Sequence, residues 1–411
     1  MQNSYDVIVI GAGAAGLMAA GTAAGQGKST LLLERNDRPA KKVLITGKGR
    51  CNVTNNCTQE HFITQVKTNG RFLYSAIAAF APQDTMAFFE RLGLPLKTER
   101  GNRVFPVSDR AADVAEALMR YAKEQGAQLT TARAQALVVE DGAVRGVVTQ
   151  DGHTLAARAV VVATGGLSYP QTGSTGDGYR LARQAGHTVT PASPALIPIV
   201  ANEDWCRRAM GLSLKNVTLT VVDDAKEKTV YSELGEMLFT HFGVSGPLVL
   251  SASSAMEFKR LPEYRLLIDL KPALSPEQLD RRIQRDFSQN LNRDFQNSLG
   301  ALLPKKMIPV IVYLSGISPD AKVNQITKEM RARLVQTMKS LCVTPRAFRP
   351  IEEAVITSGG VKISEIDPKT MRSKLCGGLH FAGEVIDVDA YTGGYNLQIA
   401  FSTGYLAGLH A

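Results

Sequence analysis

The stretch YDVIVIGAGAAGLMAAGTAAGQGKSTLLLE, residues 5–34, decides the fold. Its first six residues are mostly apolar and β-branched, which is typical of a strand buried on both faces. Three glycines follow, and a run of small residues to about Gly27 predicts a helix. Residues 29–34, STLLLE, predict a second buried strand. A strand, a helix and a strand within about 30 residues form a βαβ unit, so we expect an α/β fold with a parallel sheet.

The turn GAGAAG, residues 11–16, has the spacing of a dinucleotide-binding turn. Gly11 permits a tight turn, Gly13 lets the backbone approach a diphosphate, and Gly16 lets the helix pack on the strand. The helix that follows would present free N–H groups to the phosphates. Glu34 ends the second strand and can accept hydrogen bonds from ribose hydroxyls, which favours a ribose without a 2′-phosphate. The alternative is a glycine-rich turn without a ligand.

Three further stretches favour FAD over NAD. VVVATGG, residues 160–166, is a strand that ends in the Ala-Thr-Gly element of glutathione-reductase-type flavoproteins. FAGE, residues 381–384, with Asp387 is typical of the C-terminal flavin element. GGYNLQIA, residues 393–400, opens a helix whose positive end would stabilise an anionic reduced flavin. The alternative for the last two stretches is that they are turns at strand ends.

Composition excludes several classes of protein. The 411 residues predict two or three domains, and 44% hydrophobic residues are ordinary for a globular chain. Five scattered cysteines are too few for a disulfide scaffold, show no zinc spacing and are typical of reduced thiols in a cytoplasm. The stretch 7–24 lacks the basic residues that precede a signal peptide, and no run is long enough to span a bilayer. We therefore expect a cytoplasmic protein without a metal or a membrane contact.

Charge is concentrated in residues 276–350. This window holds 13 Lys or Arg and 6 Asp or Glu, a net charge of +7, whereas the whole chain carries +9. Such asymmetry indicates a polyanionic partner, and the alternative is a solvated helical face. Three prolines in residues 191–198 predict a domain boundary there. Residues 199–270 alternate like strands, and residues 379–387 are predicted to form a strand. Residues 71–92 and 276–340 are predicted to be helical.

The chain resembles a known family of bacterial flavoproteins. The resemblance rests on VIVIGAGAAGLMAA (7–20), KKVLITGKGRCNVTN (41–55), RVFPVSDRA (103–111), VVATGGLSYPQTGSTGDGY (161–179), LFTHFGVSGP (238–247) and LHFAGEVIDVDAYTGGYNLQIAFSTG (379–404), which together span nearly the full length. The family groups aminoacetone-oxidase-type proteins, a bile-acid Δ4,6-enone reductase and a 23S ribosomal RNA dihydrouridine synthase. Its activities differ, so the resemblance leaves the substrate open.

The resemblance implies a glutathione-reductase-type, Rossmann-like FAD-binding domain that is split in sequence by two inserted domains. The predicted limits are 1–195 with 350–411 for the FAD-binding domain, 196–275 with 341–349 for a β-rich insert, and 276–340 for a basic helical insert. The predicted FAD-binding residues are Gly11, Gly13, Ala14, Ala15, Gly16, Glu34, Arg35, Lys42, Gly49, Arg50, Cys51, Asn52, Ala136, Ala163, Thr164, Gly165, Gly383, Glu384, Asp387, Gly393, Gly394, Tyr395 and Asn396.

The chemistry expected of this family is hydride transfer from the flavin to an activated C=C bond, followed by protonation of the neighbouring carbon by a general acid. The catalytic candidates are Arg50, Cys51, His241 and Tyr391, which lie on loops expected to face the flavin. Cys51 could instead be a small buried hydrophobe, His241 a structural residue and Arg50 a loop anchor. One dinucleotide fingerprint and no redox cysteine pair indicate that NAD(P)H visits transiently as electron donor or that a separate reductase supplies the electrons.

We expect a reductase acting on uridine C5=C6 in 23S ribosomal RNA, with residues 276–350 as the contact to RNA. The alternatives are a reductase of a small enone such as a 3-oxo steroid or bile acid, an aminoacetone-type oxidase, and an FAD-binding factor without turnover. The sequence leaves the oligomeric state open.

Overall fold

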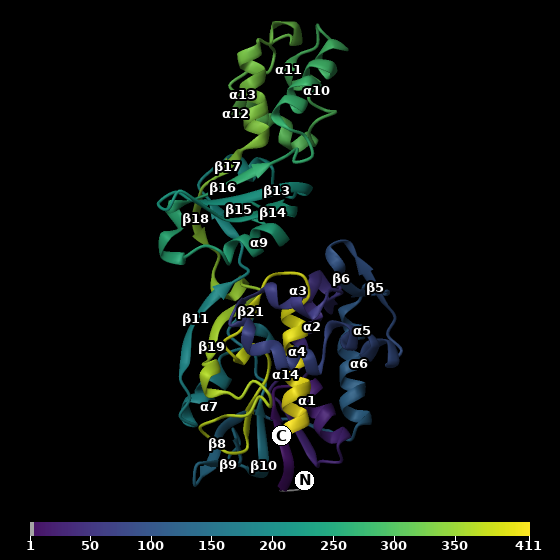
Figure 1. The fold of residues 1–411 in the computed structure, drawn as a ribbon, viewed down its shortest axis with the longest axis vertical. Helices are drawn as coiled ribbons and strands as arrows, with labels where there is room; N and C mark the ends of the chain where they lie inside the picture. Colours follow the sequence, from purple (N-terminus) through teal and green to yellow (C-terminus); the bar gives the residue numbers. More distant parts are fainter. Residues whose placement is uncertain (1–3) are drawn as a thin grey trace. The chain divides into compact units, whose positions relative to one another are not determined.

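The computed structural model describes residues 4–411, and these form two compact units (Figure 1). The first unit comprises Met1–Ala195 and Ile351–Ala411, and the second comprises Leu196–Pro350. The finer division of the second unit into a β-rich and a helical domain stays a prediction.

A parallel sheet is the centre of the first unit. Its order is β7 (Gln128–Thr131), β2 (Thr30–Glu34), β1 (Ser4–Ile10), β10 (Thr154–Val162) and β20 (Leu379–Phe381). The sheet continues from the first half of β10 into the antiparallel strands β9 (Ala143–Thr149) and β8 (Ala134–Glu140). The parallel α/β fold predicted from residues 5–34 is therefore confirmed.

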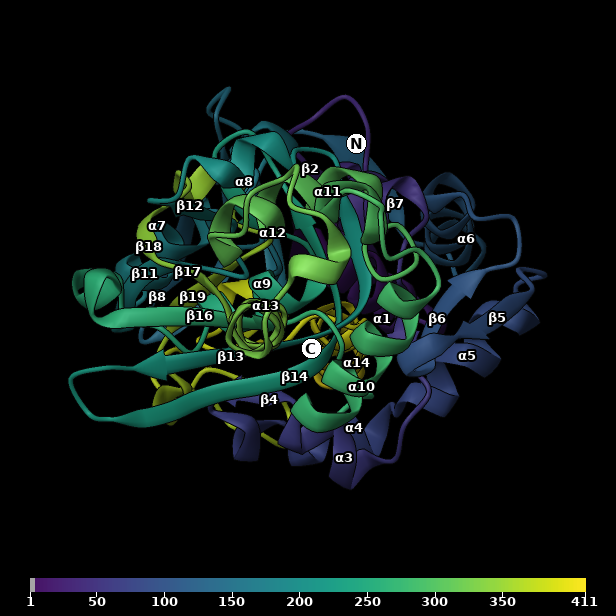
Figure 2. The same ribbon diagram turned by 90° about the horizontal axis from the view of Figure 1, so that it is seen from above.

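Two helices pack closely beside this sheet, and glycines lie at the contact between them. Helices α1 (Ala14–Gly25) and α14 (Tyr395–His410) lie side by side in both views (Figure 1 and Figure 2). A Cβ atom at Gly404 would lie 2.4 Å from the carbonyl oxygen of Ala15, and one at Gly408 would lie 2.3 Å from that of Ala19. The two backbones therefore approach to a distance that a side chain at either glycine would prevent.

The remaining elements of the first unit surround this core. They are α2 (Lys41–Ile45), β3 (Thr54–Asn55), α3 (Gln59–Thr64), β4 (Val66–Thr68), α4 (Tyr74–Ala79), α5 (Pro82–Arg91), β5 (Leu96–Glu99), β6 (Arg103–Pro106), α6 (Ala111–Glu124), α7 (Asp177–Gln184), β11 (Val189–Ala195), β19 (Ile356–Val361) and β21 (Asp389–Ala390). Strand β11 pairs antiparallel with β19, with Ala195 opposite Ile356, so the chain leaves and re-enters this unit on neighbouring strands.

The second unit begins with an antiparallel sheet. Its order is β17 (Leu341–Val343), β16 (Tyr264–Asp269), β13 (Ser213–Asp223), β14 (Lys228–Phe239), β15 (Gly243–Ser245), β12 (Ile199–Ala201) and β18 (Pro345–Phe348). The long hairpin of β13 and β14 is prominent in Figure 2. The helices of this unit are α8 (Trp205–Arg208), α9 (Pro247–Ser253), α10 (Pro276–Ser288), α11 (Phe295–Ser298), α12 (Ile308–Ser315) and α13 (Lys328–Lys339).

Two local predictions need correction. Residues 71–92 do not form one helix, because Pro82 starts α5 after an extended break at Phe80 and Ala81. Residues 379–387 do not form one strand, because Gly383 adopts a φ of +75° and turns the chain after β20. The two units divide between Ala195 and Leu196, within the proline-rich stretch 191–198. Its first part belongs to β11, where a register shift between Thr190 and Ser193 accommodates proline.

No helix in residues 4–411 is long and apolar enough to cross a membrane. In the same range, no group of three or more His, Cys, Asp or Glu side chains is arranged to hold a metal ion.

Acid should destabilise the first unit through His380. This residue lies in β20 with 2% of its surface exposed, and burial lowers its pKa from 6.5 to about 4. Because the folded pKa lies below the unfolded value, the buried neutral ring contributes stability above pH ~6.5 that is lost as pH falls toward 4, on the order of 3 kcal/mol over that range. Urea unfolding should therefore show that the free energy of unfolding falls less between pH 7 and pH 5 for His380→Leu than for the unchanged protein. Equal losses in the two proteins would contradict this assignment.

Candidate functional site

The glycine turn after β1 is closed by backbone contacts that exclude side chains. Gly11 has a φ of +99°, and a Cβ atom there would lie 2.7 Å from the carbonyl oxygen of Ala163, at the end of β10. A Cβ atom at Gly16 would lie 1.8 Å from the carbonyl oxygen of Gly11 and 3.4 Å from the Cβ of Ala163. The turn, the first residues of α1 and the end of β10 are therefore one packed structure.

The same turn leaves a site for an anion. Within the described chain, no side chain caps the N-terminus of α1 and no acidic residue lies in its first turn. A Cβ atom at Gly13, the N-cap residue, would meet no atom of residues 4–411 within 4 Å. Free N–H groups at the positive end of a helix, beside open space at a glycine, are what a diphosphate requires.

Glu34 is nearly buried at the end of β2, next to the turn. One oxygen accepts a hydrogen bond from the N–H of Ala12 at 2.9 Å. The other accepts from the backbone N–H and the side-chain amide of Asn36, each at 2.8 Å. The carboxylate is therefore fixed against the glycine turn, at the position where a ribose hydroxyl is expected to donate.

Two buried polar atoms in the predicted stretches lack a partner. The hydroxyl of Thr164 and the side-chain oxygen of Asn52 make no hydrogen bond to the residues that the structure describes. Such atoms are costly unless water or a ligand pairs with them. Gly165 follows Thr164 with a φ of +74°, and Gly49 precedes Asn52 with a φ of +84°. Both atoms therefore lie beside turns whose backbone conformation is rarely adopted by residues other than glycine.

Strand β3 contacts the start of α14. Asn55 donates to the carbonyl oxygen of Gly393 at 3.0 Å, and Thr54 donates to Gln398 at 2.6 Å. A Cβ atom at Gly394 would lie 2.4 Å from the carbonyl oxygen of Thr54. No side-chain cap or early acidic residue is found at this helix N-terminus among the described residues. The structure thus joins two predicted stretches more than 300 residues apart, next to a second uncapped helix end.

Lys42 and Glu384 form an ion pair at 2.5 Å. Glu384 also accepts hydrogen bonds from the hydroxyl of Ser168 at 2.8 Å and from the N–H of Thr357 at 2.9 Å. Burial opposes ionisation of this carboxyl, but Lys42 and these donors outweigh burial and lower its pKa. Glu384 is therefore a fixed anion that connects α2, the loop after β10, β19 and the turn after β20.

The pKa of Asp387 is shifted in the opposite direction from that of Glu384. Burial, reinforced by the nearby Asp389, raises the pKa of the Asp387 carboxyl above the ordinary value. Burial therefore disfavours the ionised form of Asp387, whereas Glu384 is held in its ionised form.

The other predicted cofactor residues have contacts within the protein. Arg35 pairs with Asp177 at 3.2 Å, and the amide of Asn396 bonds the backbone of Ala390. Tyr395 packs edge-on against Phe62, with ring centres 5.4 Å apart. The remaining members lie where the motifs place them: Ala14 and Ala15 open α1, Gly383 would contact the Cβ of Ala15 if it carried a side chain, and Ala136 lies on β8, the strand at one edge of the sheet.

The catalytic candidates differ in their surroundings. Cys51 is fully buried with a φ of +60°, and burial raises the pKa of its thiol to about 12. The guanidinium of Arg50 pairs with Glu99 and Asp109, both at 2.5 Å, and lies 4.2 Å above the ring centre of Phe105.

The other two candidates are more accessible. His241 is exposed between β14 and β15 and belongs to the second unit. Tyr391 is half-buried in the loop that enters α14, where its carbonyl oxygen accepts a hydrogen bond from Asn396 at 3.3 Å. Of the four candidates, Tyr391 lies in the loop that enters α14. Cys51 lies three residues before β3, the strand that contacts the start of this helix.

Several residues that organise the site were not predicted. Ser168 and Thr357 hold Glu384, Asn36 holds Glu34, and Gln398 ties α14 to Thr54. Three of these four contacts join residues far apart in sequence, so no local spacing could have revealed them. Asn36, two residues after Glu34, is the exception that a local pattern could have indicated.

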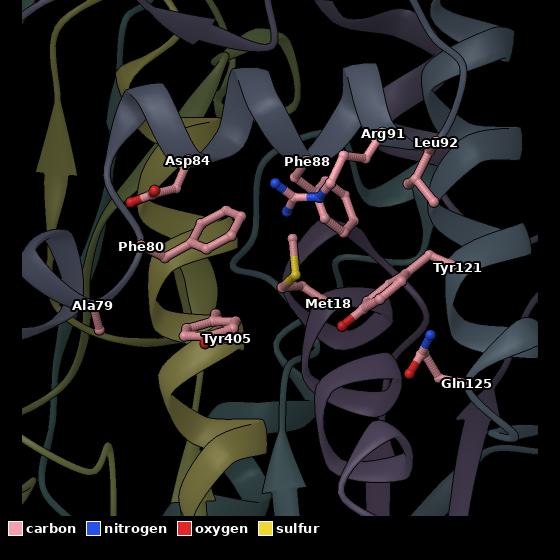
Figure 3. A pocket seen from close by; sticks show the side chains of 10 residues that line it. All are labelled: Met18, Ala79, Phe80, Asp84, Phe88, Arg91, Leu92, Tyr121, Gln125 and Tyr405. Carbon is pink, nitrogen blue, oxygen red and sulfur yellow. The ribbon is translucent and has the colours of Figure 1, made fainter.

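A different hollow of about 380 Å³ lies among α1, α4, α5, α6 and α14. Figure 3 shows the rings of Phe80 and Tyr405 close together, with centres 5.0 Å apart, and Met18 between the aromatic side chains. None of the predicted site residues is among the described side chains that line it. It is therefore separate from the glycine turn and takes no part in the cofactor site.

These features fit FAD. The open glycine, two uncapped helix ends, the fixed carboxylate of Glu34 and the unpartnered oxygens of Thr164 and Asn52 match a diphosphate, a ribose and a polar ring edge.

Comparison with known proteins gives the same result. The family model described as HI0933-like protein Rossmann domain matches residues 5–410. The chain is 31% identical to a 3-dehydro-bile acid Δ4,6-reductase of Clostridium scindens, over 97% of each chain. It is 30% identical to a ribosomal RNA dihydrouridine synthase of Escherichia coli, over 98% of this chain and 96% of the relative. It is 32% identical to the enzyme of that name from Haemophilus influenzae, over 100% and 99%.

Solved structures agree on the fold. A 3-ketosteroid Δ1-dehydrogenase of Sterolibacterium denitrificans has a TM-score of 0.53 at 16% identity, covering 100% of this chain and 99% of that one. A flavocytochrome c3 fumarate reductase has a TM-score of 0.50 at 18% identity, covering 100% and 78%. At these identities the likeness concerns the fold alone.

Substitution of Gly13 should separate folding from cofactor binding. Because a Cβ atom there has free space, Gly13→Ala should leave the unfolding midpoint of the apoprotein unchanged or slightly higher, yet place a methyl group where the diphosphate approaches. We expect at least a tenfold loss of FAD affinity, measured by flavin fluorescence during titration of the apoprotein. Gly300→Ala is the matched control, since its Cβ also meets open space. Equal FAD affinity in the two variants would contradict this placement.

Cys51 should react much more slowly than Cys342 in the folded protein. Its thiol is buried and protonated at neutral pH, whereas Cys342 is partly exposed. Mass spectrometry after native iodoacetamide treatment should find Cys342 labelled first and Cys51 labelled only after unfolding in urea. Rapid native labelling of Cys51 would show that its surroundings differ from those described.

Proposed function

The chain belongs to the HI0933-like family of FAD-dependent oxidoreductases with a Rossmann domain, and from this membership we propose that it reduces uridine C5=C6 in 23S ribosomal RNA to dihydrouridine. Two of the relatives carry the name ribosomal RNA dihydrouridine synthase and align over nearly their whole length. Action on ribosomal RNA goes with a cytoplasmic location.

The observation that carries this proposal is the charge of residues 276–350. A net charge of +7 in 75 residues favours the binding of a polyanion and does not strengthen the binding of a steroid. The arginines of α10 and of the loop after it line a polar hollow in the second unit. Polar and cationic side chains would leave the apolar rings of a steroid without matching contacts.

FAD, once bound and reduced, supplies the hydride for the C=C bond. The protein's part is to hold the cofactor and to give a proton to the neighbouring carbon. We assign the proton to Tyr391, because its side chain is half-buried beside the start of α14, whereas Cys51 is completely buried and its pKa of about 12 makes it a reluctant donor. The guanidinium of Arg50 is engaged by two carboxylates and positions the loop.

NAD(P)H is the proposed electron donor. Residues 11–16 are the single dinucleotide fingerprint in the sequence, and Cys51 and Cys57 have the wrong spacing for a dithiol relay. The nicotinamide would therefore approach the flavin transiently and leave before the substrate binds.

A second candidate is reduction of a small-molecule enone, which the 31% identity to the bile-acid reductase favours. The two functions separate in one experiment. The enzyme is reduced without oxygen, and then a 3-oxo-4,6-diene steroid or a 23S ribosomal RNA transcript is added. Recovery of the oxidised flavin spectrum with the steroid alone would replace the RNA proposal by this one.

Deletion of the gene should remove a dihydrouridine from 23S ribosomal RNA. Nucleoside mass spectrometry of purified ribosomal RNA should show the loss, and a plasmid with the intact gene should restore it. A plasmid carrying Gly13→Ala should fail to restore it, because that protein folds without its cofactor. An unchanged dihydrouridine content in the deletion strain would refute the proposal.

A further inference from the structure

We propose that a cluster of three arginines on the second unit, Arg282, Arg285 and Arg293, binds the phosphate backbone of the RNA substrate. With the side chains of Gln289, Asn290 and Asn297 they line one hollow of about 580 Å³, which we call the arginine hollow. The proposal rests on the function proposed above and locates the RNA contact within it.

Helix α10 presents the arginines by its amphipathic pattern. Leu279, Ile283 and Phe287 are buried at intervals of four residues and fix one face of the helix in the core of this unit. A capping box of Ser275 and Gln278 closes the N-terminus of the helix, with hydrogen bonds of 2.8 and 3.2 Å. The helix is therefore held in one rotational position, which aims its basic residues away from the core.

The charge in the hollow is not neutralised. Asp286 is the one carboxylate among the described residues that line it. Its two oxygens accept from the Nε of Arg282, each at 2.9 Å, while the Nε of Arg285 lies 3.9 Å away. Arg293 has no ion pair with any residue in the range 4–411. Three guanidinium groups and one carboxylate leave a local charge of about +2.

Other cations of the same helical region are paired elsewhere. Arg331 pairs with Asp280 at 3.0 Å, Lys322 with Asp294 at 2.6 Å and Lys339 with Asp269 at 2.5 Å. These pairs cancel charge where they lie. Part of the excess positive charge of residues 276–350 is therefore concentrated at the arginine hollow, where the side chain of Arg285 is 64% exposed.

The lining favours nucleic acid over a compact small molecule. Arginines match phosphate oxygens in two-pronged geometry, and the amides of Gln289, Asn290 and Asn297 can donate to phosphates or pair with a ribose 2′-hydroxyl. No aromatic side chain is found among the described lining residues. The hollow therefore suits the sugar-phosphate chain and offers no stacking platform for a flavin or a steroid.

The test replaces all three arginines by glutamine in the full-length, FAD-loaded protein. Binding to deproteinised 23S ribosomal RNA is measured at several salt concentrations. We expect at least a tenfold weaker affinity near 0.1 M salt, and a slope of log affinity against log salt that is shallower by about 2, because each lost phosphate contact removes about 0.7–0.9. Flavin content and the rate of flavin reduction by NADPH should remain unchanged.

The control carries Lys123→Gln, Arg145→Gln and Lys369→Gln, three exposed cations of the first unit, so the net charge falls equally. Loss of affinity in the arginine variant alone supports the proposal. Equal losses in both variants, or none in the arginine variant, overturn it while leaving the function intact. Failure of the unchanged protein both to bind this RNA and to reduce its uridine overturns the proposed function as well.

Discussion

The carbonyl oxygen of Gly11 occupies the space where a side chain at residue 16 would begin, and the cofactor site depends on this contact. It brings the first turn of α1 directly over the end of β1, so that the positive end of the helix faces the space beside Gly13. Close packing of α1 against α14 at Gly404 and Gly408 then orients the C-terminal helix by the same means. Contacts between backbones therefore place both helix ends that are predicted to hold the cofactor.

Electrostatics complete the arrangement at two carboxyl groups. Glu384 is buried and ionised, because Lys42 and two hydrogen-bond donors outweigh the cost of burial. Burial and the nearby Asp389 instead raise the pKa of Asp387, three residues later. One short turn thus holds two carboxyl groups whose pKa values are shifted in opposite directions.

The sequence predicted the parallel sheet, the glycine turn and the basic helical region, because each depends on local patterns: buried β-branched runs, glycine spacing and charge. It did not predict the contacts between distant segments. The bonds from Ser168 and Thr357 to Glu384 join residues up to 216 positions apart, which no periodicity encodes. The broken helix near Phe80 and the short β20 were mispredicted, because apolar spacing continues across residues whose backbone turns at Pro82 and at Gly383. The sequence indicated the arginine hollow only as an excess of positive charge. Ion pairs in the folded protein decide which cations remain without a carboxylate partner, and the sequence does not show these pairs.

The pairing of Ala195 with Ile356 gives the molecule a modular architecture. Residues 196–350 depart from one strand of a two-stranded ribbon and return to the other, so both attachment points lie on a single closed piece of the flavin-binding scaffold. A short hairpin could bridge this ribbon in place of 155 residues without altering the strand order of the parallel sheet. Selection can therefore alter residues 196–350 without disturbing the parallel sheet to which they are attached.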